Sequence, residues 1–80
     1  MNVASLVTMA NQIADFFVSE AGADAAPKEI AAHITKFWDP RMRTQIIAHA
    51  ASGGAGLSPA ALAAARALQP PAVKTASAAV

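Results

Sequence analysis

The chain has 80 residues, which allows one domain at most and only a small hydrophobic core. It contains no cysteine, so it can form neither a disulfide framework nor a thiolate site for zinc or an iron–sulfur cluster. Six basic and five acidic residues give a net charge of +1, and no run of Lys or Arg occurs. This balance argues against a nucleic-acid partner.

The sequence also shows no sign of a membrane or secretory segment. No stretch approaches the about 20 consecutive apolar residues that a transmembrane helix needs. The first residues, Met-Asn-Val-Ala-Ser, lack the positively charged region that begins a secretory signal peptide. We therefore expect a cytoplasmic protein with no membrane partner.

Two helices are predicted in the first half of the chain. The first spans residues 2–19, and Gly22 is a candidate C-terminal cap because glycine adopts a left-handed conformation without strain. Pro27 marks the start of the second, because proline is favoured in the first turn of a helix. This helix continues to Trp38.

Two further helices begin with an acceptor side chain followed by proline, a strong start signal. Asp39-Pro40 opens a helix over residues 40–51, which ends at a Gly-Gly pair, and Ser58-Pro59 opens one over residues 59–68. No alternating strand pattern occurs. The predicted fold is all-α: a small bundle of three to four short helices in a domain of residues 1–68, with a disordered C-terminal tail over 69–80.

The first helix has a wider apolar surface than one core contact requires. Its predicted core stripe consists of Leu6, Met9, Ala10, Ile13 and Phe17. Phe16 extends the apolar arc on one side, and Val3, Val7, Ala14 and Val18 extend it on the other. The arc covers roughly 200°, whereas a core stripe needs about 100°. We therefore expect a second contact, either with a partner protein or with another copy of the chain.

The second helix has an ordinary core stripe, formed by Ile30, Ile34, Phe37 and Trp38. Arg41 and Arg43 follow in the first turn of the third helix, where each cation opposes the helix dipole by about 0.3–1 kcal/mol. Two compatible interpretations remain. Trp38 stacks on Arg43 as a cation–π pair, or Trp38, Arg41 and Arg43 reach acidic or carbonyl groups of another protein, since Trp and Arg are enriched in interface hot spots.

No catalytic, cofactor-binding or metal-binding constellation is recognisable. His33 and His49 lack the spaced partners of a zinc site, so structural or solvated histidines are expected. The glycines at 53–56 lack the Gly-Lys-Ser/Thr ending of a phosphate-binding loop and predict a helix end and turn. The carboxylates are dispersed. We therefore expect a non-enzymatic protein whose predicted partner-binding residues are Phe16, Val7, Trp38, Arg41 and Arg43.

Three blocks of the chain resemble the delta subunit of bacterial NAD-dependent formate dehydrogenase. They are residues 6–17 with Met9-Ala10-Asn11-Gln12-Ile13, residues 30–43 with Phe37-Trp38-Asp39-Pro40-Arg41-Met42-Arg43, and residues 53–59. The likeness covers about residues 5–68 in the same order. The first two motifs are specific, because no general helix rule requires them. The segment after Pro59 departs from the family by being rich in alanine.

The resemblance implies an accessory role in a larger enzyme. Such enzymes oxidise formate at molybdenum or tungsten held by bis-molybdopterin guanine dinucleotide in a large alpha subunit. Iron–sulfur clusters then pass electrons to FMN, which reduces NAD. The resemblance implies that this chain carries none of these cofactors. It would bind the alpha subunit, in a complex with beta and gamma subunits, and stabilise it or assist its maturation.

Three alternatives follow from the same sequence. A dissociable chaperone for cofactor insertion would bind the immature enzyme and leave. A helical nucleic-acid-binding module would use the third helix to read DNA, although the near-neutral charge argues against it. A homodimer of the free chain would cover the wide apolar arc of the first helix.

Overall fold

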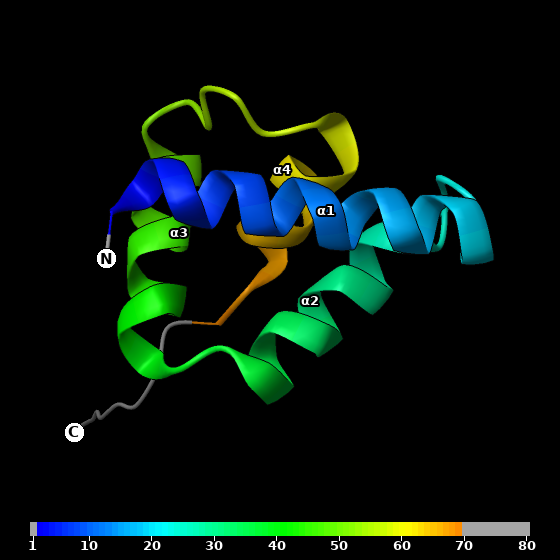
Figure 1. Ribbon diagram of the computed structural model, residues 1–80, viewed down its shortest axis with the longest axis horizontal. Helices are drawn as coiled ribbons and strands as arrows, with labels where there is room; N and C mark the ends of the chain where they lie inside the picture. The colour runs from blue at the N-terminus through cyan, green and yellow to red at the C-terminus, as the bar shows by residue number, and fades with distance from the viewer. Residues whose placement is uncertain (1, 70–80) are drawn as a thin grey trace, which may run out of the picture.

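The computed structural model describes residues 2–69, and this part of the chain contains four α-helices and no strand. The helices are α1 (Val3–Ala21), α2 (Ala26–Phe37), α3 (Pro40–Ala51) and α4 (Pro59–Ala67) (Figure 1). The all-α prediction is confirmed, and every predicted helix boundary lies within two residues of the observed one. The predicted disordered tail falls outside the described residues, except for Gln69.

The helix starts are built as the sequence predicted. The Asp39 side chain accepts a hydrogen bond from the backbone N–H of Met42 at 3.0 Å, and the Ser58 hydroxyl accepts one from the N–H of Ala61 at 3.3 Å. Each of these bonds satisfies an N–H that would otherwise lack a partner in the first helical turn. At the end of α1, Gly22 has a φ of 86° and donates its N–H to the Val18 carbonyl. The predicted cap at Gly22 is therefore also present.

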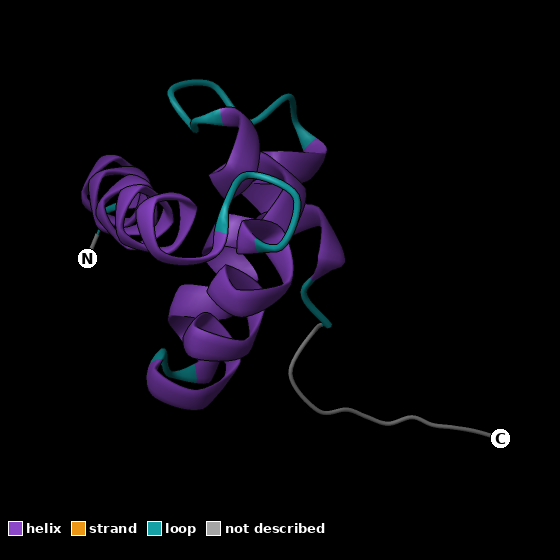
Figure 2. Cartoon of the chain, turned by 90° about the vertical axis from the view of Figure 1, so that its right-hand side faces the viewer, coloured by secondary structure: helices purple, strands orange, loops and turns teal. Residues whose placement is uncertain are grey.

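The helices pack around one another in a single bundle. In Figure 1, α1 runs across the front, α2 leaves below its C-terminal end and slopes away from it, and α3 crosses near its N-terminal end. Figure 2 views α1 nearly along its axis, with the other helices to one side. Helix α4 packs against α2 and also contacts α1 and α3. This short helix therefore sits where the other three meet.

The core is made largely of alanine. Among the described residues, four large side chains are completely buried: Leu6, Ile30, Ile34 and Ile46. Seven alanines are buried with them, at positions 10, 14, 26, 50, 61, 64 and 65. Small side chains allow helix axes to approach closely, and they leave little room between the helices for bulky groups. Several larger apolar side chains of α1, among them Met9 and Phe16, lie outside this core.

This packing shifts the buried face of α1 away from the predicted stripe. Leu6, Ala10 and Ala14 form the buried line, whereas Ile13 and Phe17 are half-buried beside it. Met9 was predicted to lie in the core, but 37% of its surface is exposed. The prediction at Met9 was wrong because the neighbouring helices pack against the alanines of α1.

The prediction for α2 was wrong at Phe37, which is 65% exposed, while the adjacent Trp38 is buried with 5% exposed. Trp38 is the C-cap of α2 and has an extended backbone (φ −85°, ψ 140°), so it no longer follows the helical spacing. Phe37 is the last helical residue and lies at the end of α2 that diverges from α1 (Figure 1). The diverging helices leave it uncovered.

The loop between α3 and α4 is fastened to α1 by one side chain. The Asn11 amide donates to the Gly56 carbonyl at 2.8 Å and accepts from the Ser58 N–H at 2.9 Å. A third bond joins His49 Nε2 to the Ala55 carbonyl at 2.7 Å, so His49 has a structural contact. Gly54 is buried at a φ of 67°, and a Cβ there would meet the Leu62 side chain. The glycine-rich segment is thus a fixed turn.

Trp38→Ala is expected to unfold the chain. Removing a buried Trp costs about 3–5 kcal/mol, which equals the roughly 3–5 kcal/mol that a single core of this size supplies. Phe37→Ala is the matched control, because that aromatic side chain is mostly exposed. Circular dichroism with urea titration should show lost helicity only for Trp38→Ala. A cooperative transition at the wild-type urea midpoint in Trp38→Ala would contradict a core role for the indole ring.

Asn11→Ala should remove both bonds that hold the loop to α1. The expected loss of unfolding free energy is about 1–3 kcal/mol, since two backbone groups lose their partner. Gln12→Ala, at an exposed neighbouring position, should change stability by less than about 0.5 kcal/mol. Thermal unfolding of both variants measures the difference. Equal melting temperatures would show that the two Asn11 hydrogen bonds contribute nothing to stability.

Candidate interaction surface

Four ring side chains form a continuous line across α1 and α2, here named the aromatic ridge: Phe16, Phe17, His33 and Phe37. The Phe16 and Phe17 rings meet edge to face, with centroids 5.0 Å apart. The His33 ring lies 5.9 Å from Phe17 and 4.7 Å from Phe37. Because each ring touches the next, the ridge links the outer faces of the two helices.

The two ends of the ridge are open to water. Phe16 is 58% exposed and Phe37 is 65% exposed, whereas Phe17 and His33 between them are half-buried. Met9 is also exposed and lies seven residues before Phe16, on the same flank of α1. Apolar surface left in water is unfavourable, and a group of such side chains indicates an interaction site.

A shallow depression and one cation accompany the ridge. Gln12 and Ile13 line a depression of about 270 Å³ together with Phe16, Phe17 and His33. The Lys36 ammonium lies 5.6 Å from the centre of the Phe37 ring, which is cation–π distance. The ridge therefore offers apolar rings with a positive charge at its Phe37 end.

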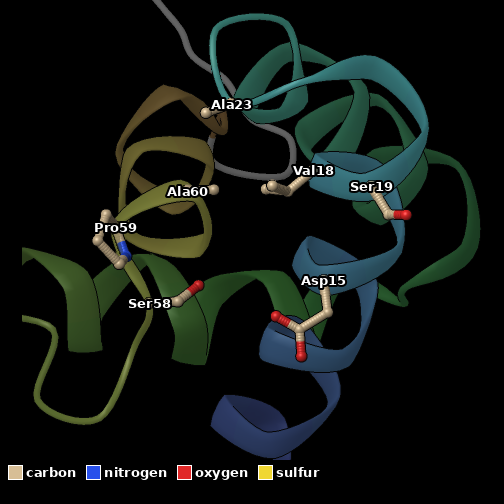
Figure 3. A pocket seen from close by; sticks show the side chains of 7 residues that line it. All are labelled: Asp15, Val18, Ser19, Ala23, Ser58, Pro59 and Ala60. Carbon is tan, nitrogen blue, oxygen red and sulfur yellow. The ribbon is translucent and has the colours of Figure 1, made fainter.

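The opposite flank of α1 carries a second hollow, between α1 and the start of α4 (Figure 3). Its volume is about 390 Å³, and it is lined by Asp15, Val18, Ser19, Ala23, Ser58, Pro59 and Ala60. Val18 is the largest apolar side chain there and is 38% exposed. Helix α1 thus exposes apolar groups on both flanks, as the width of its apolar arc predicted.

The five predicted partner-binding residues occupy different environments. Phe16 and Arg41 are exposed, but Val7 and Arg43 are half-buried and Trp38 is buried. The Val7 side chain packs on the core beside Gly56. These placements give Val7 and Trp38 contacts inside the bundle, and of Trp38, Arg41 and Arg43 only Arg41 is exposed. Binding by any of the five remains a prediction.

Arg43 has a contact within the chain that the sequence did not reveal. Its Nη1 donates to the backbone carbonyl of Trp38 at 2.7 Å. Arg43 was proposed to stack on the Trp38 ring, but its hydrogen bond is to the Trp38 backbone. That carbonyl lies at the C-terminal end of α2, where the helix dipole favours a cation. The favourable field of α2 offsets the unfavourable field at the start of α3.

The ridge was only partly recognisable from the sequence. Phe16 was identified because it lies outside the helical core stripe. Phe37 and Met9 were assigned to the core, and His33 was expected to be a structural or solvated histidine. The signal for Phe37 was its position: the last helical residue before an Asp-Pro start signal lies at a corner of the chain, where neighbouring helices cover it poorly.

The described residues contain no group of three or more His, Cys, Asp or Glu side chains placed to hold a metal ion. Over the same residues, no helix has both the length and the apolar character needed to cross a membrane.

The comparison with protein families covers most of the described chain. The family model described as NADH-dependent formate dehydrogenase delta subunit FdsD matches residues 5–65, from the first turn of α1 into α4. The chain belongs to this family. The matched residues of this delta-subunit family member include the aromatic ridge, the two Asn11 hydrogen bonds and the hydrogen bond from Arg43 to the Trp38 carbonyl. No curated protein and no solved structure matches the chain.

Substitution should show that the two arginines at the start of α3 contribute differently to stability. Arg43→Ala is expected to cost about 1.5–3 kcal/mol of unfolding free energy, because it removes a charged hydrogen bond to the Trp38 carbonyl. Arg41→Ala, at an exposed position, should stay within about 0.5 kcal/mol of wild type. Urea denaturation of the isolated chain measures both. A larger loss for Arg41→Ala would contradict the assignment.

Proposed function

We propose that this FdsD-family chain is a non-catalytic accessory subunit of a cytoplasmic NAD-dependent formate dehydrogenase. It binds the large alpha subunit and stabilises that subunit or assists its maturation. Family membership supports a place in the complex. The observation that carries the docking role is the aromatic ridge, whose end residues Phe16 and Phe37 are more than half exposed. Within residues 2–69, no element of the chain covers them.

The redox cofactors in this proposal belong to the other subunits. Bis-molybdopterin guanine dinucleotide with molybdenum or tungsten would be bound by the alpha subunit. Iron–sulfur clusters, FMN and the NAD site would be carried elsewhere in the partner complex. The chain has no cysteine, the residue that holds iron–sulfur clusters most often, so its contribution is a protein surface.

Accessory subunits and assembly chaperones both need an exposed docking surface, and they differ in how long they stay bound. A subunit is recovered with the active enzyme in a fixed ratio. A chaperone is recovered with the cofactor-free alpha subunit and is absent from the finished complex. The stoichiometry in the purified active enzyme therefore decides between these two roles.

Co-expression with the alpha, beta and gamma subunits tests the proposal. We expect the tagged chain to co-elute with active enzyme in a constant molar ratio. We also expect enzyme made without it to contain less molybdopterin or to lose activity faster on warming. Recovery of the chain only with cofactor-free alpha subunit would establish the chaperone role. Recovery with neither form would refute the proposed function.

A further inference from the structure

We infer that the aromatic ridge is the docking surface, and that it inserts into a concave apolar groove of the large subunit with a carboxylate facing Lys36. This inference rests on the proposed function, because it names the surface through which the proposed subunit binds. It also excludes a second copy of the chain as the partner of this surface. The shape, the area and the charge of the ridge support it in turn.

The shape of the ridge determines the shape of its partner. Phe16 and Phe37 protrude from α1 and α2, and the half-buried Phe17 and His33 rings bridge them. Each exposed ring packs against a half-buried ring, which restricts its motion, so less side-chain freedom is lost on binding than for an isolated ring. A protruding set of rigid rings is buried most completely by a groove. A flat surface would contact only the tips of Phe16 and Phe37.

The area of the ridge argues against a second copy. A buried aromatic side chain covers about 150–250 Å², so the exposed parts of Phe16 and Phe37 amount to roughly 100–150 Å² each. Even with Met9, a two-fold contact of two ridges would bury well under the about 800 Å² per partner of a stable interface. A groove also covers the flanks of both helices, so it buries more of the surface around the rings than a second protruding ridge can.

The charge at the Phe37 end specifies the rim of the groove. Lys36 lies beside the Phe37 ring, so a partner that covers the ring also removes water from the ammonium group. Removing water from a charge is costly unless an opposite charge replaces it. A carboxylate at this point of the partner meets the requirement and fixes the direction in which the ridge enters the groove.

The other candidate surfaces offer weaker evidence for docking. The hollow between α1 and α4 exposes one medium-sized apolar side chain, Val18, and is otherwise lined by small or polar groups. At the start of α3, Arg43 already donates to the Trp38 carbonyl. Among the surfaces of the described helices, only the ridge combines large exposed rings with an adjacent charge.

Binding of the purified chain to enzyme assembled from the other subunits tests the inference. The double variant Phe16→Ala/Phe37→Ala should bind about 30-fold more weakly, the loss that removal of interface hot spots produces. Val18→Ala is the matched control for apolar truncation on the opposite flank of α1. Circular dichroism should show wild-type helicity in both, because the truncated side chains lie outside the core.

The charge is tested separately. Lys36→Glu should weaken binding by about fivefold, whereas Lys28→Glu, an exposed lysine nearer the start of α2, should leave it unchanged. This variant alters no apolar contact of the core, so it tests the surface even if the double variant folds poorly. Equal binding of both lysine variants would overturn the carboxylate assignment.

The remaining outcomes separate this inference from the proposed function. If wild-type chain binds the enzyme and the double variant binds equally well, the ridge is not the docking surface, whereas the proposed place in the complex, supported by the family match, is retained. If wild-type chain does not bind at all, the proposed function itself fails. Light scattering of the free chain adds one condition. A dimer that Phe16→Ala/Phe37→Ala converts to a monomer would overturn the choice of partner.

Discussion

The Asn11 side chain holds together two parts of the chain that lie more than 40 residues apart, and the position of α4 depends on it. The hydrogen bonds of its side-chain amide to the Gly56 carbonyl and the Ser58 N–H fix Ser58, the residue that caps α4. The α4 helix buries only alanines, at 61, 64 and 65, each of which contributes little apolar area. Directional hydrogen bonds therefore fix the start of α4, while the half-buried Leu62 and the buried Leu68 at its C-cap hold the helix against the core. The glycine-rich turn supplies the backbone path, since Gly54 lies where a side chain would meet Leu62.

The alanine core and the exposed aromatic ridge have a common origin. Where small side chains line the contacts between helices, the helices approach closely, and no space remains for rings between them. Most of the bulky groups of α1 are consequently displaced to its flanks, where Phe16 and Met9 are exposed. One large aromatic side chain is buried, that of Trp38, at the corner where α2 ends and α3 begins. Close packing inside the bundle thus leaves an exposed apolar surface outside it.

The sequence predicted what is local and failed where the outcome depends on how the helices cross. The caps at Asp39 and Ser58 follow from neighbouring residues alone, and both are present. Phe37 and Trp38 were assigned to one core stripe, because a helical wheel assumes 100° per residue. Trp38 leaves that spacing in an extended conformation, and the divergence of α1 from α2 exposes Phe37. Neither feature is encoded in the periodicity, so of the ridge only the exposed position of Phe16 could be inferred beforehand.

Binding and folding are energetically linked in a chain of this size. A single small core supplies roughly 3–5 kcal/mol. A partner that binds only the folded form adds about 2.7 kcal/mol when its concentration is 100 times the dissociation constant. The two contributions are comparable, so the bound chain would be considerably more stable than the free one. The aromatic groups that the bundle cannot enclose contribute little to its stability when it is alone, yet they provide apolar surface that a partner can bury. A docking protein gains from this arrangement, because the folded chain becomes most stable where its partner is present.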